Sequence, residues 1–277
     1  MRNRARMSRE PTLLVVTPTL GTSPYLEETI RGVQALPFSV KHLLAVPQPM
    51  VVTLQEKYPG CLVVPDAGKA GGIYGALNKA LENAGDDWDW FTYINDDDLL
   101  GEDFASVFLK HIRQPGPAPV VYGNVRLIDD KGARLGTITT ENNPAYIPAL
   151  LQQGTSPLNQ QGMLFQRECV RKLGGFDLQY KLCADLDFWA RALAGGFAFR
   201  FYPAELGRFR IREGQLSGNI LLTREELTRI TAAHFPQTVS PLGKKWAKVR
   251  YRWINLPRYL ERFRRSGVKT SEEILES

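Results

Sequence analysis

The sequence predicts an α/β protein in which helices flank a mixed, mostly parallel central sheet and a short helical appendage follows. Three observations support this prediction. Apolar runs rich in β-branched residues alternate with helical patterns through the first half of the chain. The chain is long enough, at 277 residues with 43% hydrophobic residues, to bury a sizeable core. The excess of basic residues is confined to one C-terminal segment.

The alternation is regular through residue 112, which predicts consecutive β-α-β units. The expected strands are Thr12–Thr17, His42–Val46, Cys61–Val64 and Trp90–Ile94. The expected helices are Tyr25–Leu36, Val51–Tyr58, Ile73–Ala84 and Phe104–Ile112. Three more strand-like runs follow without helices between them: Val120–Tyr122, Val125–Ile128 and Leu135–Thr139. The second half is therefore expected to be mixed.

Charge and composition divide the chain into three parts. We expect a basic N-terminal extension over residues 1–10, one α/β domain over 11–236 and a basic amphipathic helical tail over 237–277. Residues 241–267 carry nine Lys/Arg and the single acid Glu261, which leaves 26 basic and 28 acidic residues elsewhere. Aromatic and basic residues interleave there as one or two helices interrupted at Pro257.

Such a tail indicates an anionic surface nearby, and an anionic membrane is the surface that fits a basic, aromatic-rich helix. The alternative is a solvated helix that packs on the domain or forms an oligomer contact. No nucleic-acid partner is expected.

Cysteine and hydropathy patterns bear on the compartment. Cys61, Cys169 and Cys183 are widely spaced and form no CxxC pair, which disfavours a disulfide framework and a zinc site. They are expected to be buried thiols in a reducing cytoplasm. No run of about 18 apolar residues is present, so neither a membrane span nor a signal peptide is expected. A cytoplasmic protein, peripheral on the inner face of the membrane, fits these features.

The strongest local pattern is an apolar strand that ends in three consecutive carboxylates. Asp96, Asp97 and Asp98 follow this strand within the segment Phe91–Leu100. Adjacent acids repel one another, so a compensating cation is the natural explanation. Hard oxygen ligands suit Mg²⁺ or Mn²⁺, which neutralise a departing diphosphate. The alternative is a solvated turn in which one Asp caps the next helix.

A second acidic pattern occurs in Lys181–Leu193, where Asp185 and Asp187 are two residues apart. Residues at this spacing cannot share one helix face. If the neighbouring apolar residues fix the buried side, one Asp faces a cleft and the other has a structural role. An Asp near a helix start also commonly serves as a cap.

Six segments in order resemble family 2 glycosyltransferases, which have the GT-A fold, and the resemblance covers residues 11 to about 218. The segments are Val15–Thr19 followed by Tyr25–Ile30, Gly72–Lys79, Ile94–Leu100 as the DXD-type motif, Asn159–Arg167, Leu173–Asp177 and Ala184–Arg191. Arg208–Arg212 and Gly214–Gly218 resemble the family's closing strand and loop. The arginines of this strand either clamp a diphosphate or are solvated.

The resemblance implies an inverting, metal-assisted transferase that moves a hexosyl or N-acetylhexosaminyl group from a UDP-, GDP- or dTDP-linked donor to a saccharide or lipid-linked acceptor. Its general base is Asp185, which takes a proton from the acceptor hydroxyl. The implied metal ligands are Asp98, as the main ligand, and Asp96, with Mn²⁺ or Mg²⁺ as the ion. The implied donor-binding residues are Thr17, Asp66, Asn78, Asp96 and Asp97. On the acceptor or sugar side are Gln161 and Trp189, the latter equally a core candidate.

The sequence departs from the family pattern at two places. Leu44–Met50 offers no carboxylate where the family usually has one, and Gly75 stands where relatives often carry Asp.

Two other functions are also considered. A sugar-nucleotide nucleotidyltransferase would open with a glycine-rich, arginine-containing loop, which Pro18–Pro24 does not match. A non-catalytic membrane or nucleic-acid adaptor with a degenerate sugar-binding body would use the basic tail, but it leaves the acidic residues unexplained.

Overall fold

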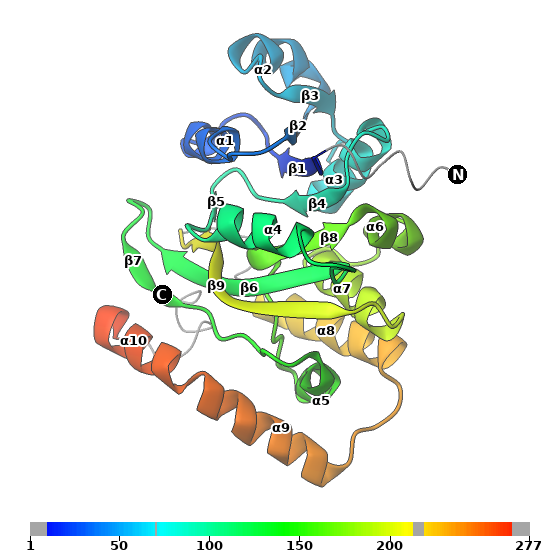
Figure 1. The fold of residues 1–277 in the computed structure, drawn as a ribbon, viewed down its shortest axis with the longest axis vertical. Coiled ribbons are helices and arrows are strands. Elements are labelled where there is room, and N and C mark those ends of the chain that lie inside the picture. Colours follow the sequence, from blue (N-terminus) through cyan, green and yellow to red (C-terminus); the bar gives the residue numbers. More distant parts are fainter. Residues whose placement is uncertain (1–9, 70, 213–218, 268–277) are drawn as a thin grey trace.

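A single twisted sheet forms the centre of the molecule, and helices cover both of its faces (Figure 1). The computed structural model describes residues 10–69, 71–212 and 219–267. Within these residues the sheet has nine strands in the order β3-β2-β1-β4-β8-β6-β9-β5, and β7 pairs with β6. The predicted α/β class with a mostly parallel sheet is confirmed.

The first half of the chain forms the parallel part of the sheet. Its strands are β1 (Leu13–Pro18), β2 (Val40–Val46), β3 (Leu62–Pro65) and β4 (Trp90–Tyr93), all paired in parallel. The connecting helices are α1 (Leu26–Gln34), α2 (Val51–Lys57) after the short 3₁₀ turn η2 (Gln48–Met50), and α3 (Gly72–Asn83). The predicted β-α-β units are present, with element ends shifted by one or two residues.

Strand β1 lies inside the sheet and is covered on both faces. Leu14 and Val16 contribute to the core beneath α3 and α7, whereas Leu13 and Val15 contribute to the core beneath α4. Successive side chains of a strand point to opposite faces, so a strand covered on both sides buries every residue and is mostly apolar. All six residues of β1 are accordingly buried.

The second half adds antiparallel pairs. Its strands are β5 (Leu99–Leu100), β6 (Val120–Ile128), β7 (Arg134–Thr137), β8 (Met163–Gln166) and β9 (Phe199–Arg210). β8 runs antiparallel to both β4 and β6, while β9 is parallel to β6. The two short runs expected at 120–122 and 125–128 form the single strand β6, because a register shift at Asn124 keeps the pairing continuous.

The remaining helices cover the sheet or form its rim. They are α4 (Phe104–Ile112), α5 (Ile147–Leu151), α6 (Arg167–Leu173), α7 (Ala184–Ala194) and α8 (Ile220–His234), with short 3₁₀ turns η3 (Pro144–Tyr146) and η4 (Gln160–Gly162). The last two are α9 (Pro241–Ile254) and α10 (Leu256–Ser266). In Figure 1 these two run in succession along the side of the molecule opposite α2.

The basic tail therefore consists of two helices, and its break lies at Asn255, two residues before Pro257. Asn255 is fully buried and hydrogen-bonds the backbone of Thr140 through both its side-chain oxygen and its nitrogen. Ala247 and Tyr251 of α9 are buried against α5. Among the helices of the described residues, none combines the length and the hydropathy needed to cross a membrane.

A buried histidine of β2 predicts acid sensitivity. His42 contacts Thr17 Oγ1 at 3.0 Å and Cys61 Sγ at 3.6 Å, and burial lowers its pKa to about 4. Because the unfolded pKa is near 6.5, this contribution to stability is complete above pH 6.5 and is lost as pH falls toward 4, by about 3 kcal/mol. We expect His42→Gln, which cannot titrate, to flatten this part of the unfolding free energy measured against pH. Parallel curves for the two proteins would contradict this assignment.

Candidate active site

The predicted acidic residues lie in the turn between β4 and β5, at the carboxyl end of the parallel strands. This is the edge at which open α/β sheets bind ligands. The three neighbours nevertheless have different environments. Asp96 is partly exposed, Asp97 is 5% exposed and Asp98 is fully buried. They therefore cannot have equivalent roles.

Asp98 is held inside the protein by hydrogen bonds to both of its carboxylate oxygens. Oδ1 accepts from the backbone N–H of Arg210 at 2.9 Å. Oδ2 accepts from Gln161 Nε2 at 3.0 Å and from Asn95 Nδ2 at 3.3 Å. Burial and the adjacent charge of Asp97 raise the pKa of Asp98 to about 7. As the main metal ligand, Asp98 would have to give up at least one of these hydrogen bonds, so its contacts favour a supporting role in the turn.

The other two acids are better placed for a ligand. Asp96 Oδ2 accepts a hydrogen bond from Thr19 Oγ1 at 2.5 Å, and burial raises the Asp96 pKa. Asp97 Oδ2 pairs with Arg212 Nε at 2.5 Å. Within the described residues, the buried Asn95 Oδ1 has no hydrogen-bond partner. These oxygen atoms are of the hard type that a divalent cation prefers, although no group of three or more His, Cys, Asp or Glu side chains in the described residues is arranged to hold one.

A buried arginine fixes the acidic turn to its surroundings. Arg210 is 1% exposed, and its Nε donates to the backbone oxygen of Asp97 at 2.8 Å. Its Nη1 donates to the backbone oxygens of Asp129 and Asp130 in the β6–β7 hairpin, and its Nη2 pairs with Glu28 of α1 at 2.7 Å. Neither of the two roles left open for this arginine, a diphosphate clamp or a solvated cation, fits a guanidinium used in this way.

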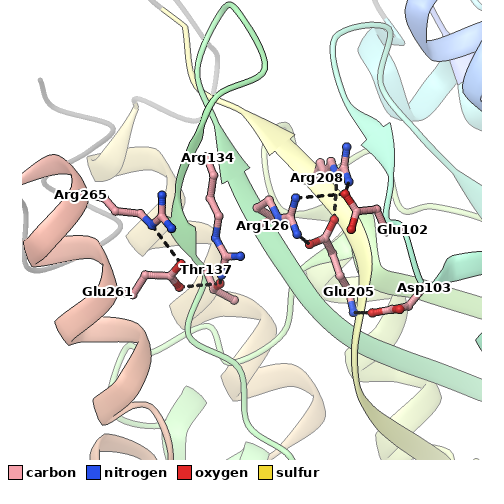
Figure 2. Close-up of polar contacts among 9 residues, drawn as sticks. All are labelled: Glu102, Asp103, Arg126, Arg134, Thr137, Glu205, Arg208, Glu261 and Arg265. Carbon is pink, nitrogen blue, oxygen red and sulfur yellow. Dashed lines mark hydrogen bonds and ion pairs between the residues drawn. The ribbon is translucent and has the colours of Figure 1, made fainter.

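The neighbouring arginine of β9 also has protein partners. Arg208 pairs with Glu205 at 2.7 Å and with Glu102, and Arg126 of β6 pairs with the same two acids (Figure 2). Asp103 accepts a hydrogen bond from the backbone of Glu205 at 2.9 Å. Among Arg208, Arg210 and Arg212, the side chain of Arg212 is the most exposed, and it lies beside Asp97. The loop Gly214–Gly218, expected to follow this strand, lies outside the described residues.

The second acidic pattern separates into a site residue and a structural residue. Asp185, at the start of α7, is partly exposed, and Tyr74 Oη lies 3.0 Å from its Oδ1 and 2.7 Å from the backbone oxygen of Leu182. Burial raises the Asp185 pKa. Asp187 is buried and bonds Arg191 and His234, both at 2.7 Å.

Asp185 and the acidic turn face the same region. Tyr93, the last residue of β4, is buried, and burial together with the charges of both Asp185 and Asp98 raises its pKa well above the usual value. The Tyr93 ring also packs on Phe176 with the ring centroids 5.6 Å apart, and Tyr74, which contacts Asp185, packs on the same ring at 5.7 Å. The general-base candidate and the candidate metal turn therefore border one site at the end of β4.

The remaining expected site residues fall into two groups. Asp66 and Gln161 are partly exposed and lie at the same edge of the sheet as the acidic turn. Asp66 also accepts a hydrogen bond from the Gly68 backbone at 2.8 Å. Thr17 and Trp189 are buried, the former bonded to His42 and the latter packed in the core. The buried position of Thr17 does not fit a direct contact with the nucleotide-sugar donor. Trp189 lies in the core, which was the alternative given for it.

Asn78 is partly exposed, but its side chain is held by the protein. Its amide makes a reciprocal pair of hydrogen bonds with the backbone of Phe176, each 2.8 Å long. This pairing fastens α3 to the loop before α7. A nucleotide contact by the Asn78 side chain would have to break it.

Sequence reasoning missed the residue that shapes the start of α7. Glu226 of α8 is 1% exposed and accepts the backbone N–H groups of Lys181 at 2.6 Å, Leu182 at 2.9 Å and Cys183 at 2.8 Å. It thereby holds the loop that leads into Asp185. No local pattern marks Glu226, because its three partners lie more than 40 residues away.

Comparison with known proteins identifies this arrangement. The family model "Glycosyl transferase family 2" matches residues 14–174, which contain the first four strands and the acidic turn. The chain belongs to glycosyl transferase family 2. Two uncharacterized glycosyltransferases of Mycobacterium tuberculosis, from strains CDC 1551 and H37Rv, are each 26% identical over 197 residues, covering 67% of this chain and 70% of theirs.

Solved structures of GT-A glycosyltransferases share this fold. S. aureus TarS 1–349 in complex with UDP-GlcNAc aligns with a TM-score of 0.63 at 14% identity, over 89% of this chain and 73% of that one. Mannosyltransferase PcManGT from Pyrobaculum calidifontis, in complex with GDP-Man and Mn²⁺, aligns at 0.59 with 16% identity, over 92% and 73%. This chain spans 43% of the longer TarS chain.

Loss of the Glu226 carboxylate should separate positioning from chemistry. In Glu226→Gln the side-chain NH₂ group replaces one carboxylate oxygen and faces one of the three backbone N–H groups, so that this N–H loses its acceptor. We therefore expect the substitution to lower the free energy of unfolding by about 1–3 kcal/mol. We also expect it to lower kcat more than it raises the donor KM, because Asp185 loses its fixed position. Glu225→Gln, at the exposed neighbouring position, is the matched control. Equal melting temperatures for the two variants would contradict the positioning role.

Proposed function

We propose that this protein is an inverting, metal-assisted glycosyltransferase that uses a nucleoside-diphosphate sugar. The observation that carries the proposal is the single site bordered by the Asp96–Asp98 turn and Asp185. Family membership supports the transferase class, and the donors held by the similar proteins support a nucleotide-sugar substrate. The transferred group is proposed to be a hexosyl or N-acetylhexosaminyl group.

A divalent cation fits the oxygen atoms of the acidic turn. The proposed holders of Mn²⁺ or Mg²⁺ are Asp96, Asp97 and Asn95 Oδ1, which has no hydrogen-bond partner among the described residues, and Asp98 fixes the turn through its own hydrogen bonds. When bound, such an ion would neutralise charge on the diphosphate leaving group. Arg212, which pairs with Asp97, lies where it can also attract an anionic donor.

Asp185 is proposed as the general base. Its carboxylate accepts the proton of the acceptor hydroxyl as that oxygen forms a bond to the anomeric carbon, while the bond from this carbon to the diphosphate breaks. The nucleoside diphosphate leaves with the bonding electrons, so one displacement inverts the anomeric configuration. Tyr74 orients Asp185, and partial burial raises the carboxylate's pKa and therefore its basicity.

The acceptor is proposed to be a saccharide, in particular one linked to a lipid on the cytoplasmic leaflet. The exposed apolar and basic residues of α9 and α10 support a lipid-borne acceptor. The three free cysteines are buried, which suits a reducing compartment. Together these features favour a cytoplasmic, peripheral enzyme of polysaccharide assembly.

The metal assignment predicts different defects for neighbouring acids. Asp97→Asn should weaken Mn²⁺-dependent donor binding at least about tenfold, because it removes a charged hard ligand. Asp98→Asn should instead lower the melting temperature, because an amide nitrogen would face the donors that now bind the carboxylate. Calorimetric titration of UDP-, GDP- and dTDP-sugars with and without Mn²⁺ measures the first effect. Loss of metal dependence in stable Asp98→Asn, with Asp97→Asn unaffected, would restore Asp98 as the main ligand.

The base assignment predicts a pH profile. Asp185 must be ionised to accept a proton, so turnover should fall as pH decreases through its raised pKa, at a pH above the usual range for Asp. Asp185→Asn should lower donor hydrolysis and transfer by about 10²- to 10⁴-fold with little change in donor affinity. Asp86→Asn, which removes an exposed carboxylate at the opposite end of β4, is the control. Turnover by Asp185→Asn at the wild-type rate would exclude this base.

A further inference from the structure

The exposed face of α9 and α10 carries a continuous apolar stripe. Its members are Leu242, Trp246, Val249, Trp253, Leu256, Leu260 and Phe263. Their spacing alternates between four and three residues without a gap, so they lie on one side of the helices across the bend at Asn255. The two tryptophans are 60% and 71% exposed. Apolar side chains gathered in this way indicate a contact surface rather than scattered surface residues.

The opposite face of the same helices is already used. Glu261 of α10 pairs with Arg134 of β7 at 2.6 Å and accepts a hydrogen bond from Thr137 at 3.0 Å (Figure 2). Arg262 is fully buried against Gly136. These contacts fix the rotation of α10, and with it the outward direction of the stripe.

Exposed cations accompany the stripe, and their charge is of one sign. Lys245, Lys248 and Arg252 form a parallel row, each directly before an apolar member of the stripe. In the part of the chain that the structure describes, none of the three forms an ion pair. The single acid of these helices, Glu261, turns inward toward β7. As far as the described residues show, the outer face therefore presents aromatic and aliphatic groups beside positive charge that has no acidic partner.

We propose that this face of α9 and α10 docks on an anionic lipid surface. A bilayer interface accepts tryptophan rings and aliphatic side chains at the level where its phosphate groups attract cations. A second copy of the chain is a poorer partner. Symmetric pairing of two such faces would bring like-charged rows together, and neither face has an outward acid among the described residues to neutralise them. The proposal concerns binding alone and does not depend on the enzymatic assignment.

Vesicle binding tests the charge component. The probes are vesicles of phosphatidylcholine alone and of phosphatidylcholine mixed with phosphatidylglycerol, with the full chain and co-sedimentation as the readout. Each cation near such a surface contributes about fivefold to partitioning. Lys245→Gln/Lys248→Gln/Arg252→Gln should therefore bind the anionic vesicles about a hundredfold more weakly. The control triple Lys57→Gln/Lys110→Gln/Arg113→Gln removes equal charge from exposed positions elsewhere and should bind like wild type.

Tryptophan fluorescence tests the apolar component. Three of the five tryptophans are buried, at positions 88, 90 and 189, so only Trp246 and Trp253 can meet lipid. Brominated acyl chains in the anionic vesicles should quench wild-type emission. Trp246→Ser/Trp253→Ser should fold, show no lipid quenching and lose most of its vesicle binding.

Three results would overturn the proposal. The first is absence of binding to either kind of vesicle. The second is binding that both charge triples weaken equally without tryptophan quenching, which indicates adsorption by net charge. The third is a concentration-dependent dimer in sedimentation equilibrium that Trp246→Ser/Trp253→Ser abolishes, which assigns the stripe to a second copy. An intact vesicle response in a protein that turns over no donor would contradict the proposed function and leave this surface supported.

Discussion

The buried guanidinium of Arg210 is the interaction on which the site depends. A buried charge destabilises a fold unless it is paired and hydrogen-bonded. Arg210 meets this condition through Glu28, the backbone of the acidic turn and the β6–β7 hairpin. Three segments far apart in sequence must come together to satisfy one side chain. The turn of three carboxylates therefore has a fixed conformation before any ligand is bound.

Contacts between distant segments also fix the Asp185 side of the site. The start of α7 has no side-chain cap of its own, and Glu226 of α8 supplies the acceptor oxygens for the residues just before it. Tyr74 of α3 then contacts Asp185 from the opposite direction. Because these partners come from separate helices, the carboxylate position is set by tertiary packing, and the low mobility that catalysis needs follows from the fold.

The alternation of apolar strands and helices was sufficient to predict the parallel half of the sheet, while the interleaved aromatic and basic residues predicted one or two helices in the tail. The residue patterns also located Asp185 and the acidic turn. They could not distinguish Asp96, Asp97 and Asp98, because adjacent residues with the same side chain differ only in what the fold places around them. They could not place the Thr17 side chain either, because a threonine at the end of a strand looks the same in sequence whether it faces a ligand or a buried histidine. Glu226 and Arg210 act through long-range contacts that carry no local pattern.

The tail and the site share a structural connection that affects how their functions can be separated. Helix α10 packs on β7, the β6–β7 hairpin supplies the backbone oxygens of Asp129 and Asp130, and these oxygens bind Arg210 behind the acidic turn. Removing α9 and α10 would uncover Leu150 and the backbone around Gly136. Truncation would thus disturb the hairpin and the turn together, and an inactive truncated protein would not distinguish an adaptor from an enzyme. Substitutions confined to the outward stripe leave every one of these contacts in place, so only they can assign surface binding and catalysis independently.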